Sequence, residues 1–135
     1  MQNEISVSIH IRRGDFVKVK CRLLELSYYQ KAIQYMREKF KNPHFYVFSD
    51  DIQWAKDNLK TNADVTFVDW TTSAEEDLHL MTKTNHNIIA NSSFSWWGAF
   101  LNKNKEKIVI IPSTGFYNDG YEHMKVDDNW IVIKE

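Results

Sequence analysis

The chain of 135 residues is 43% hydrophobic and 14% aromatic, with 17 basic against 18 acidic side chains. A chain of this length buries enough surface to fold as one domain without disulfide or metal staples. Its net charge of −1 excludes the domain-wide basic excess of a nucleic-acid-binding protein, and no apolar run reaches the roughly 20 residues of a membrane span. The single cysteine, Cys21, allows no internal disulfide and fits a reducing compartment.

The first predicted element is a strand over residues 5–11, in which apolar and polar residues alternate. The alternation places His10 and Arg12 on one face and Arg13 on the other, so one guanidinium can face a ligand while the second is tethered. Asp15 follows a glycine turn and can hold an arginine in place. Arginine suits phosphate oxygens because its planar fork donates two hydrogen bonds. An ordinary ion-paired strand end explains the same residues equally well.

A helix is predicted next, with Ser27 and Gln30 as its capping box and Pro43 beyond its end. The apolar residues of this helix recur at helical spacing: Tyr29, Ala32, Ile33, Met36 and Phe40.

Residues 45–48 form a short predicted strand that leads into Asp50 and Asp51, which are good caps for a helix across Trp54 and Leu59. Paired carboxylates also bind magnesium in many enzymes. No further carboxylate is placed to complete such a site, so we favour the helix cap.

Residues 65–68 form the next strand, and Ser73 with Glu76 makes a second capping box for a helix through Met81. Asp77 lies in the first turn of that helix, where the helix dipole favours a carboxylate. One carboxylate can also accept two hydrogen bonds, from the N1–H and the 2-amino group of guanine. Composition does not choose between the two roles of Asp77.

A strand over residues 88–90 precedes Asn91, Ser92 and Ser93, which cap another helix that carries Phe94. Unpaired N–H groups and hydroxyls at a helix N-terminus form an anion site, although a plain cap is the commoner role of two serines. The N-glycosylation pattern at Asn91 falls in a turn that we expect to be buried, so we interpret it as accidental.

The last elements are a strand over residues 108–111, stopped by Pro112, and an edge segment over 130–133. Strands that alternate with helices predict an α/β fold with a Rossmann-like parallel sheet and helices on both faces. Ligands of such sheets bind beyond the carboxyl ends of the strands. The loops of interest are those after Arg12, Phe48, Val68 and Ala90.

The tryptophans and histidines point to packing rather than to a metal site. Trp96 and Trp97 are adjacent on their helix, about 100° apart, and we predict core positions for both. Trp70 is either a packing residue or a platform for a glycan. The histidines lack the spacing of zinc ligands, so no metal site is predicted.

Four motifs, taken together, resemble the GDP-fucose-binding half of the α-1,2-fucosyltransferases, glycosyltransferase family 11. They occupy residues 10–15, 48–51, 77–81 and 85–94. The position of Asp77, fifteen residues before Ser92, also resembles the spacing in α-1,6- and protein O-fucosyltransferases. The resemblance covers about residues 5–112.

The resemblance implies the donor-binding domain of a GT-B glycosyltransferase that transfers fucose, with inversion, from GDP-β-L-fucose to the 2-hydroxyl of a galactose-terminated glycan. It implies no metal or other cofactor. Arg12 would hold the β-phosphate and stabilise departing GDP, in surroundings shaped by His10 and Asp15, with Arg13 as a further substrate-binding residue. Asp77 would bind guanine. The diphosphate would lie against the helix end formed by Ser92, Ser93 and Phe94.

Two features depart from the family. Phe16 stands where the family has a tyrosine, which removes a hydroxyl. The family also has a further N-terminal half, so we expect residues 1–135 to be one excised domain. No residue is assigned as the base that deprotonates the acceptor.

Other hypotheses remain open beside the enzyme. One is a non-catalytic module that binds a guanine nucleotide sugar or a glycan, and another is a domain that docks a partner chain through an exposed apolar patch. The composition favours a bacterial cytoplasmic enzyme of surface-polysaccharide synthesis, with peripheral membrane association of the full-length protein as a further hypothesis.

Overall fold

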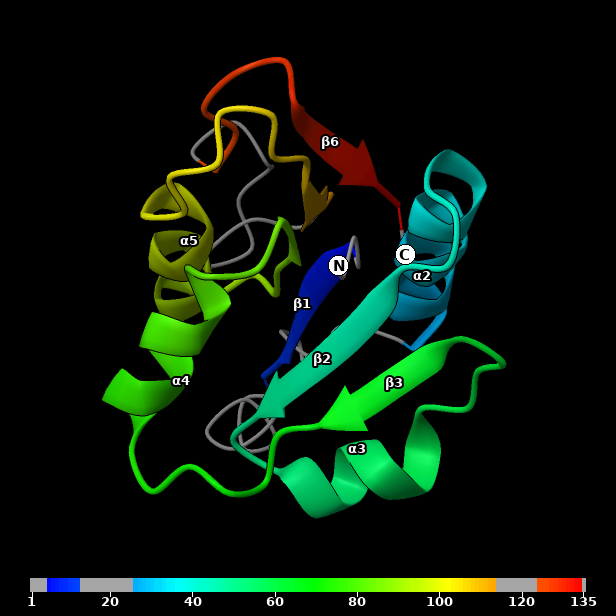
Figure 1. Cartoon of the computed structure of the whole chain (residues 1–135), viewed down its shortest axis with the longest axis vertical. Helices are drawn as coiled ribbons and strands as arrows, with labels where there is room; N and C mark the ends of the chain where they lie inside the picture. Colours follow the sequence, from blue (N-terminus) through cyan, green and yellow to red (C-terminus); the bar gives the residue numbers. More distant parts are fainter. Residues whose placement is uncertain (1–4, 13–25, 114–123, 135) are drawn as a thin grey trace, which may run out of the picture.

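A parallel sheet of six strands forms the centre of the structure, a computed structural model that describes residues 5–12, 26–113 and 124–134 (Figure 1). Its strands are β1 (Ser6–Ile11), β2 (His44–Ser49), β3 (Asp64–Phe67), β4 (His86–Ile88), β5 (Val109–Pro112) and β6 (Trp130–Ile133). They lie in the order β3-β2-β1-β4-β5-β6, and all neighbours are parallel. The chain moves outward from β1 in one direction and then crosses back to β4, so the ligand-binding switch point of a Rossmann-like sheet lies between β1 and β4.

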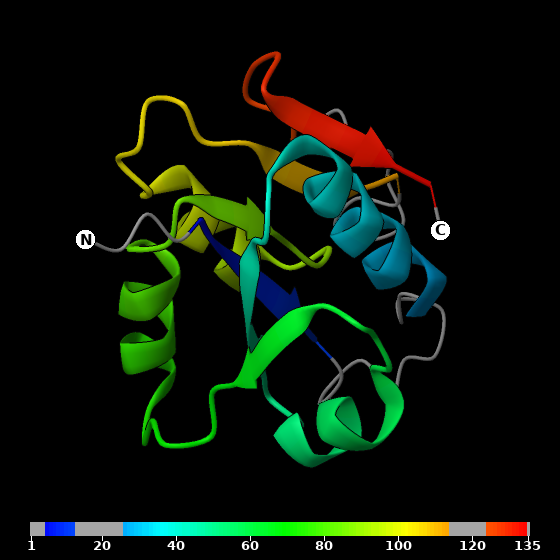
Figure 2. The same ribbon diagram turned by 45° about the vertical axis from the view of Figure 1, so that its right-hand side comes forward.

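Helices cover both faces of this sheet, as the sequence predicted (Figure 2). In the described residues they are α2 (Leu26–Lys39), α3 (Ile52–Asn58), α4 (Ala74–Met81) and α5 (Ser93–Phe100). Helices α2 and α3 pack on one face, and α4 and α5 lie side by side on the other. The alternating strand–helix pattern therefore specified the α/β class correctly.

The larger core lies under α2 and α3, where the odd-numbered residues of β1 are buried. Val7 and Ile9 are fully buried there beside Ile33 of α2. Tyr28 ties α2 to the sheet because its hydroxyl lies 2.6 Å from the carbonyl oxygen of Ile89 and 3.1 Å from that of Ile110. The even-numbered residues of β1 consequently face α4 and α5.

The close contact between α4 and α5 depends on Gly98. A Cβ at this position would lie 2.7 Å from Cε of Met81 and 3.5 Å from Cδ1 of Leu78. A larger side chain at position 98 would have to displace the end of the Met81 side chain, which is fully buried. The first turns of α4 and α5 lie near the same edge of the sheet because both helices follow the carboxyl end of a parallel strand.

Several predicted boundaries differ from the structure by one or two residues, and three of them are instructive. Helix α2 already includes Leu26, so Ser27 is not its cap. Strand β4 ends at Ile88 rather than at residue 90, because the N–H of Ala90 donates to the hydroxyl of Ser95 instead of to a strand. Pro112 does not stop β5 but is its last residue, paired with Ile133.

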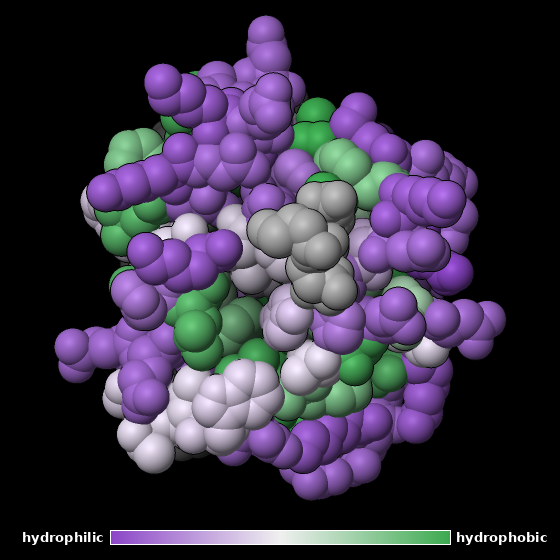
Figure 3. Space-filling model, viewed as in Figure 1, coloured by the Kyte–Doolittle hydropathy of each residue, from purple (hydrophilic) through white to green (hydrophobic). Residues whose placement is uncertain are grey.

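The surface seen in Figure 3 is hydrophilic around most of its edge, with apolar side chains near its centre and on the side of α5. On α5, Trp96 is half-buried, and its Nε1–H donates to the carbonyl of Met124 at 2.8 Å. Trp97, in contrast, is 48% exposed, and its neighbour Phe100 is 44% exposed. The prediction that both tryptophans lie in the core was therefore wrong for Trp97. Among the described residues, no helix is long and apolar enough to cross a membrane.

Candidate functional site

A pocket of about 240 Å³ opens at the carboxyl ends of β1 and β2, next to the switch point. Its lining residues are His10, Arg12, Ser49, Asp50, Ala74, Asp77 and Phe94. A wider hollow of about 360 Å³ lies at the amino ends of β2 and β3, between Arg37 and Asp64. We place the candidate site in the smaller pocket, because parallel sheets bind ligands at the carboxyl ends of their strands.

Arg12 enters the pocket directly after β1. Its Nε lies 3.5 Å from Oδ2 of Asp50, and the two side chains are 27% and 29% exposed. The register of the sheet explains this pair, since Ile11 lies beside Ser49 and the residues that follow both strands meet at the same edge. The predicted arginine partner, Asp15, lies outside the described residues, as does Arg13.

The two neighbouring aspartates have different roles. Asp50 faces Arg12, whereas Asp51 caps α3 by accepting a hydrogen bond from the backbone N–H of Trp54 at 3.3 Å. Ser49 fixes the backbone that leads from β2 into the two aspartates. Its hydroxyl donates to the carbonyl of Ile11 at 2.7 Å and accepts from the N–H of Asp51 at 3.0 Å. The helix cap predicted for Asp51 is confirmed. In the part of the chain that the structure describes, no three His, Cys, Asp or Glu side chains are grouped as a metal site would require.

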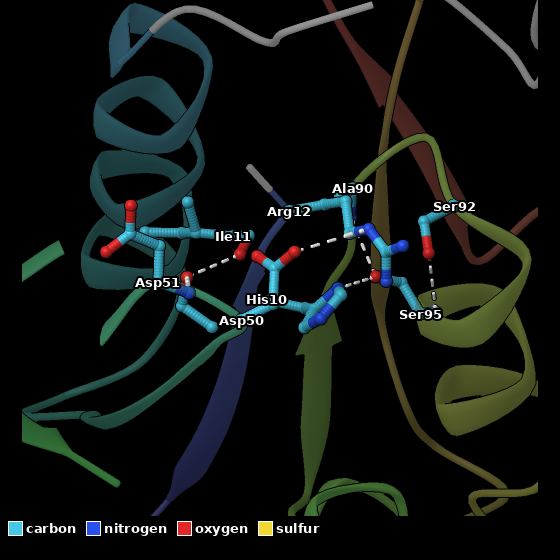
Figure 4. Close-up of polar contacts among 9 residues, drawn as sticks. His10, Ile11, Arg12, Asp50, Asp51, Ala90, Ser92 and Ser95 are labelled. Atoms are coloured by element: carbon cyan, nitrogen blue, oxygen red, sulfur yellow. Dashed lines mark hydrogen bonds and ion pairs between the residues drawn. The ribbon is translucent and has the colours of Figure 1, made fainter. Parts of the chain in front are cut away.

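His10 lies at the end of β1 with 3% of its surface exposed. Its Nδ1 contacts the hydroxyl of Ser95 (Figure 4). Its ring centre lies 5.2 Å from that of Phe94. Burial, together with the positive charge of Arg12, lowers the pKa of His10 from 6.5 to about 3. The imidazole is therefore neutral at physiological pH.

The N-terminus of α5 follows β4 as predicted, with Ser92 as its cap. The Ser92 hydroxyl accepts a hydrogen bond from the N–H of Ser95 at 3.4 Å. Asn91 is only 3% exposed, so the buried turn expected at the N-glycosylation pattern is confirmed. Phe94 lines the pocket, whereas Ser92 and Ser93 do not.

Asp77 reaches the pocket from the first turn of α4, where the sequence places it. Its Oδ1 accepts a hydrogen bond from the Thr71 hydroxyl at 2.5 Å. Partial burial raises the pKa of Asp77; the Thr71 hydrogen bond opposes this, and the charge of Glu76 adds to it.

Half of the predicted capping box of α4 is present. The hydroxyl of Ser73 accepts from the N–H of Glu76, but the Glu76 carboxylate accepts from the N–H of Thr72 at 3.0 Å instead of reaching back to Ser73. The first turn that presents Asp77 is thus fixed by both Ser73 and Thr72.

Sequence reasoning missed Asp50 as a partner of Arg12, and it missed Ser95. The only signal for Ser95 was its position three residues after the cap Ser92, in the first turn after a buried strand. The predicted residues that the structure does bring together in one pocket are His10, Arg12, Asp77 and Phe94.

Comparison with known proteins gives a consistent result. The protein-family model described as Glycosyl transferase family 11 matches residues 1–134. An α-1,2-colitosyltransferase of Escherichia coli is 44% identical over 140 residues, which covers 96% of this chain and 48% of that protein. The O-antigen biosynthesis glycosyltransferase WbnK of Escherichia coli is 35% identical, with 98% and 46% covered.

A more distant relative is the galactoside α-(1,2)-fucosyltransferase 1 of Homo sapiens, which is 33% identical over 103 residues and covers 70% of this chain and 28% of that protein. The chain therefore spans about half the length of the bacterial relatives that it matches. No solved structure matches.

Proposed function

The chain belongs to glycosyl transferase family 11, and from this premise we propose that it binds the GDP-fucose donor of an inverting α-1,2-fucosyltransferase. The acceptor in this proposal is the 2-hydroxyl of a galactose-containing glycan. The relative from Homo sapiens is named for this linkage.

One observation carries the proposal. Arg12, His10 and Asp77 come from two separate elements and line one pocket at the carboxyl edge of the sheet, beside the switch point between β1 and β4. A guanidinium is suited to a diphosphate, and a carboxylate is suited to the two donors on the edge of guanine. Arg12 and Asp77 would thus bind opposite ends of a guanosine diphosphate.

In the proposed reaction the acceptor oxygen forms a bond to C1 of fucose on the face opposite the leaving group. The bond between C1 and the β-phosphate oxygen breaks, and its electron pair leaves with GDP. Negative charge develops on the β-phosphate, where the guanidinium of Arg12 would stabilise it. The proton of the acceptor hydroxyl leaves to a base that the described residues do not identify.

We also propose that the reaction needs no metal ion. Arg12 provides a permanent positive charge in the pocket, and Asp50 and Asp51 are engaged by Arg12 and by the cap of α3. GDP binding and fucosyl transfer are therefore expected to be unchanged by EDTA.

Calorimetric titration of the chain with GDP, GDP-fucose, ADP and UDP tests the donor site. We expect binding of both guanine nucleotides and at least about tenfold weaker binding of ADP and UDP, since one lost charged hydrogen bond changes affinity by this factor or more. Equal affinity for all nucleotides, or no binding by the folded chain, would contradict the proposal.

The Asp77→Asn variant tests the role of the carboxylate in base selection. An amide cannot accept both guanine hydrogen bonds, so we expect the preference for GDP over ADP to fall about tenfold. Asp64→Asn is the matched control, because Asp64 is exposed at the amino end of β3, away from the pocket. Retained preference in Asp77→Asn would place guanine recognition elsewhere.

Transfer assays distinguish an enzyme from a binding module. The relative at 44% identity is named for colitosyl transfer, so GDP-colitose is tested as a donor beside GDP-fucose. Transfer of either sugar to a galactose-terminated acceptor supports the enzyme.

Trp70 favours the glycan-binding alternative, because it is 59% exposed and lines a pocket of about 300 Å³ with Tyr46 and Leu80. Glycan binding that is lost in Trp70→Ala, without transfer, would support that alternative.

A further inference from the structure

The buried contact between His10 and Ser95 determines which nitrogen of the imidazole carries its proton. Ser95 is fully buried, and its hydroxyl oxygen accepts a hydrogen bond from the N–H of Ala90 at 3.3 Å. The other hydrogen-bond partner of this hydroxyl among the described residues is Nδ1 of His10. The hydroxyl hydrogen of Ser95 therefore has Nδ1 as its acceptor.

The opposite arrangement would leave a buried donor without an acceptor. If Nδ1 carried the proton, both it and the N–H of Ala90 would donate to the Ser95 oxygen, and the hydroxyl hydrogen would have no partner. A buried polar hydrogen without an acceptor is costly. A neutral imidazole with an accepting Nδ1 carries its proton on Nε2.

Nε2 is the ring nitrogen that Ser95 leaves for a ligand, since His10 lines the candidate site and only its Nδ1 contacts Ser95. Figure 4 shows the His10 ring turned toward Ser95, which its Nδ1 contacts, and this contact leaves Nε2 unengaged by Ser95. Phe94 packs against the ring and limits its rotation. The charged side chains that share this pocket with His10 are Arg12, Asp50 and Asp77.

We propose that Ser95 is a positioning residue: its hydroxyl holds His10 as the Nε2–H tautomer, so that His10 donates a hydrogen bond to a diphosphate oxygen beside the one that Arg12 binds. The proposal rests on the proposed function, since it takes a nucleoside diphosphate as the ligand. His10 then supplies a neutral donor instead of a second charge. It does not act as the base for the acceptor hydroxyl, because Nε2 is already protonated and Nδ1 is occupied.

The tautomer is measured directly on the chain labelled with ¹⁵N-histidine. The two-bond ¹H–¹⁵N spectrum distinguishes Nε2–H from Nδ1–H, and loss of one signal set in His10→Gln assigns the signals of His10. We expect the Nε2–H pattern without change between about pH 6 and 8. An Nδ1–H pattern, or a charged ring in this range, would overturn the inference.

Ser95→Ala tests whether the serine is the cause. We expect the His10 signals to shift toward a mixture of tautomers, because the donor to Nδ1 is removed. The matched control is Ser8→Ala, which removes a buried hydroxyl from β1, the strand that carries His10. The Ser8 hydroxyl accepts a hydrogen bond from Asn87 at 2.6 Å and does not contact His10. The control should keep the Nε2–H pattern. An unchanged pattern in Ser95→Ala would refute the positioning role.

GDP titrations connect the tautomer to binding. We expect Ser95→Ala to weaken GDP binding about two- to tenfold and to leave guanosine binding unchanged, because guanosine has no phosphate. In the His10→Gln background the same substitution should have little effect, since no imidazole remains to be positioned. An equal loss in both backgrounds would indicate a merely structural serine. Absence of GDP binding by the unmodified chain would instead overturn the proposed function, and with it the ligand assigned to His10.

Discussion

Two polar clusters lie on the same face of the sheet, at opposite ends of β1 and β4. We call the first the amino-end cluster: Ser8, Thr84, Asn87 and Asn102. The second is the pocket cluster: His10, Arg12 and Asp77. All four side chains of the amino-end cluster are buried, whereas the pocket cluster borders a hollow.

The amino-end cluster is closed by its own hydrogen bonds. The amide nitrogen of Asn87 donates to the Ser8 hydroxyl at 2.6 Å and to the carbonyl of Met81 at 2.9 Å, and its oxygen accepts from Asn102 at 2.9 Å. Asn102 also donates to the carbonyl of Thr84 at 2.7 Å. Every hydrogen-bonding atom of the Asn87 amide is thus engaged within the protein, as a structural role requires.

The pocket cluster differs because the fold shifts its ionisation. Burial lowers the pKa of His10 and raises the pKa of Asp77, because in both cases it disfavours the charged form. Shifted pKa values in a concave site are typical of binding and catalytic groups. Ser8 and His10 lie on the same face of β1, yet Ser8 belongs to a closed hydrogen-bonded cluster, whereas His10 lines a hollow in which we propose that a ligand binds.

The largest effect should come from opening the amino-end cluster. Asn87→Ala leaves the partner groups on Ser8 and Asn102 buried without their hydrogen bonds, and we expect the free energy of unfolding to fall by about 2–4 kcal/mol. Urea unfolding measures this free energy. Asn62→Ala, at an exposed asparagine, is the control and should change stability by less than about 0.5 kcal/mol. Similar values for both variants would show that the cluster has no structural role.

Arg12→Ala should have the reverse profile, with a large effect on binding and a small one on stability. The loss of a charged hydrogen bond to phosphate is expected to weaken GDP binding by about 1.5–3 kcal/mol, roughly tenfold to more than a hundredfold. The ion pair with Asp50 is partly exposed, so its loss should cost at most about 1 kcal/mol of stability.

Arg37→Ala is the matched control for Arg12, because it removes the same charge from an exposed position on α2, beyond the opposite face of the sheet. Calorimetry on the two variants separates a local contact from a change in net charge. Unchanged GDP affinity in Arg12→Ala, or an equal loss in Arg37→Ala, would refute the phosphate role.

The sequence predicted the residues of the pocket cluster, but it did not predict Asp50 and Ser95, which contact Arg12 and His10. Alternation along β1 put His10 and Arg12 on one face, and the capping pattern at Ser73 put Asp77 in a first turn, so local rules sufficed. Asp50 and Ser95 were missed because their roles depend on which strands are neighbours and on their register. A single sequence does not reveal either.

The exposure of Trp97 was missed for a related reason. Helix α5 is apolar on nearly all sides, so its periodicity does not show which face turns inward. Packing decides it: Ala99 and Gly98 are buried against the sheet and α4, and Trp97 is left outside. Composition alone predicts burial for such a residue, and only the contacts of its neighbours correct it.

The last effect is a gradual one, a dependence of the stability of the pocket cluster on pH. The pKa of His10 is 6.5 in an unfolded chain and about 3 in the fold, so between these values the unfolded chain binds more protons at this site. The free energy of unfolding should therefore fall as the pH decreases from about 6.5, by up to about 1.4 kcal/mol per pH unit from His10 alone.

His10→Gln should flatten this slope, whereas His79→Gln, at an exposed histidine of α4, should keep it. His86, whose pKa burial also lowers, adds to the slope in all three proteins, so the difference between them isolates His10. Urea midpoints between about pH 4 and 7 measure the slopes, and equal slopes in all three would mean that His10 takes up its proton in the folded chain as readily as in the unfolded one.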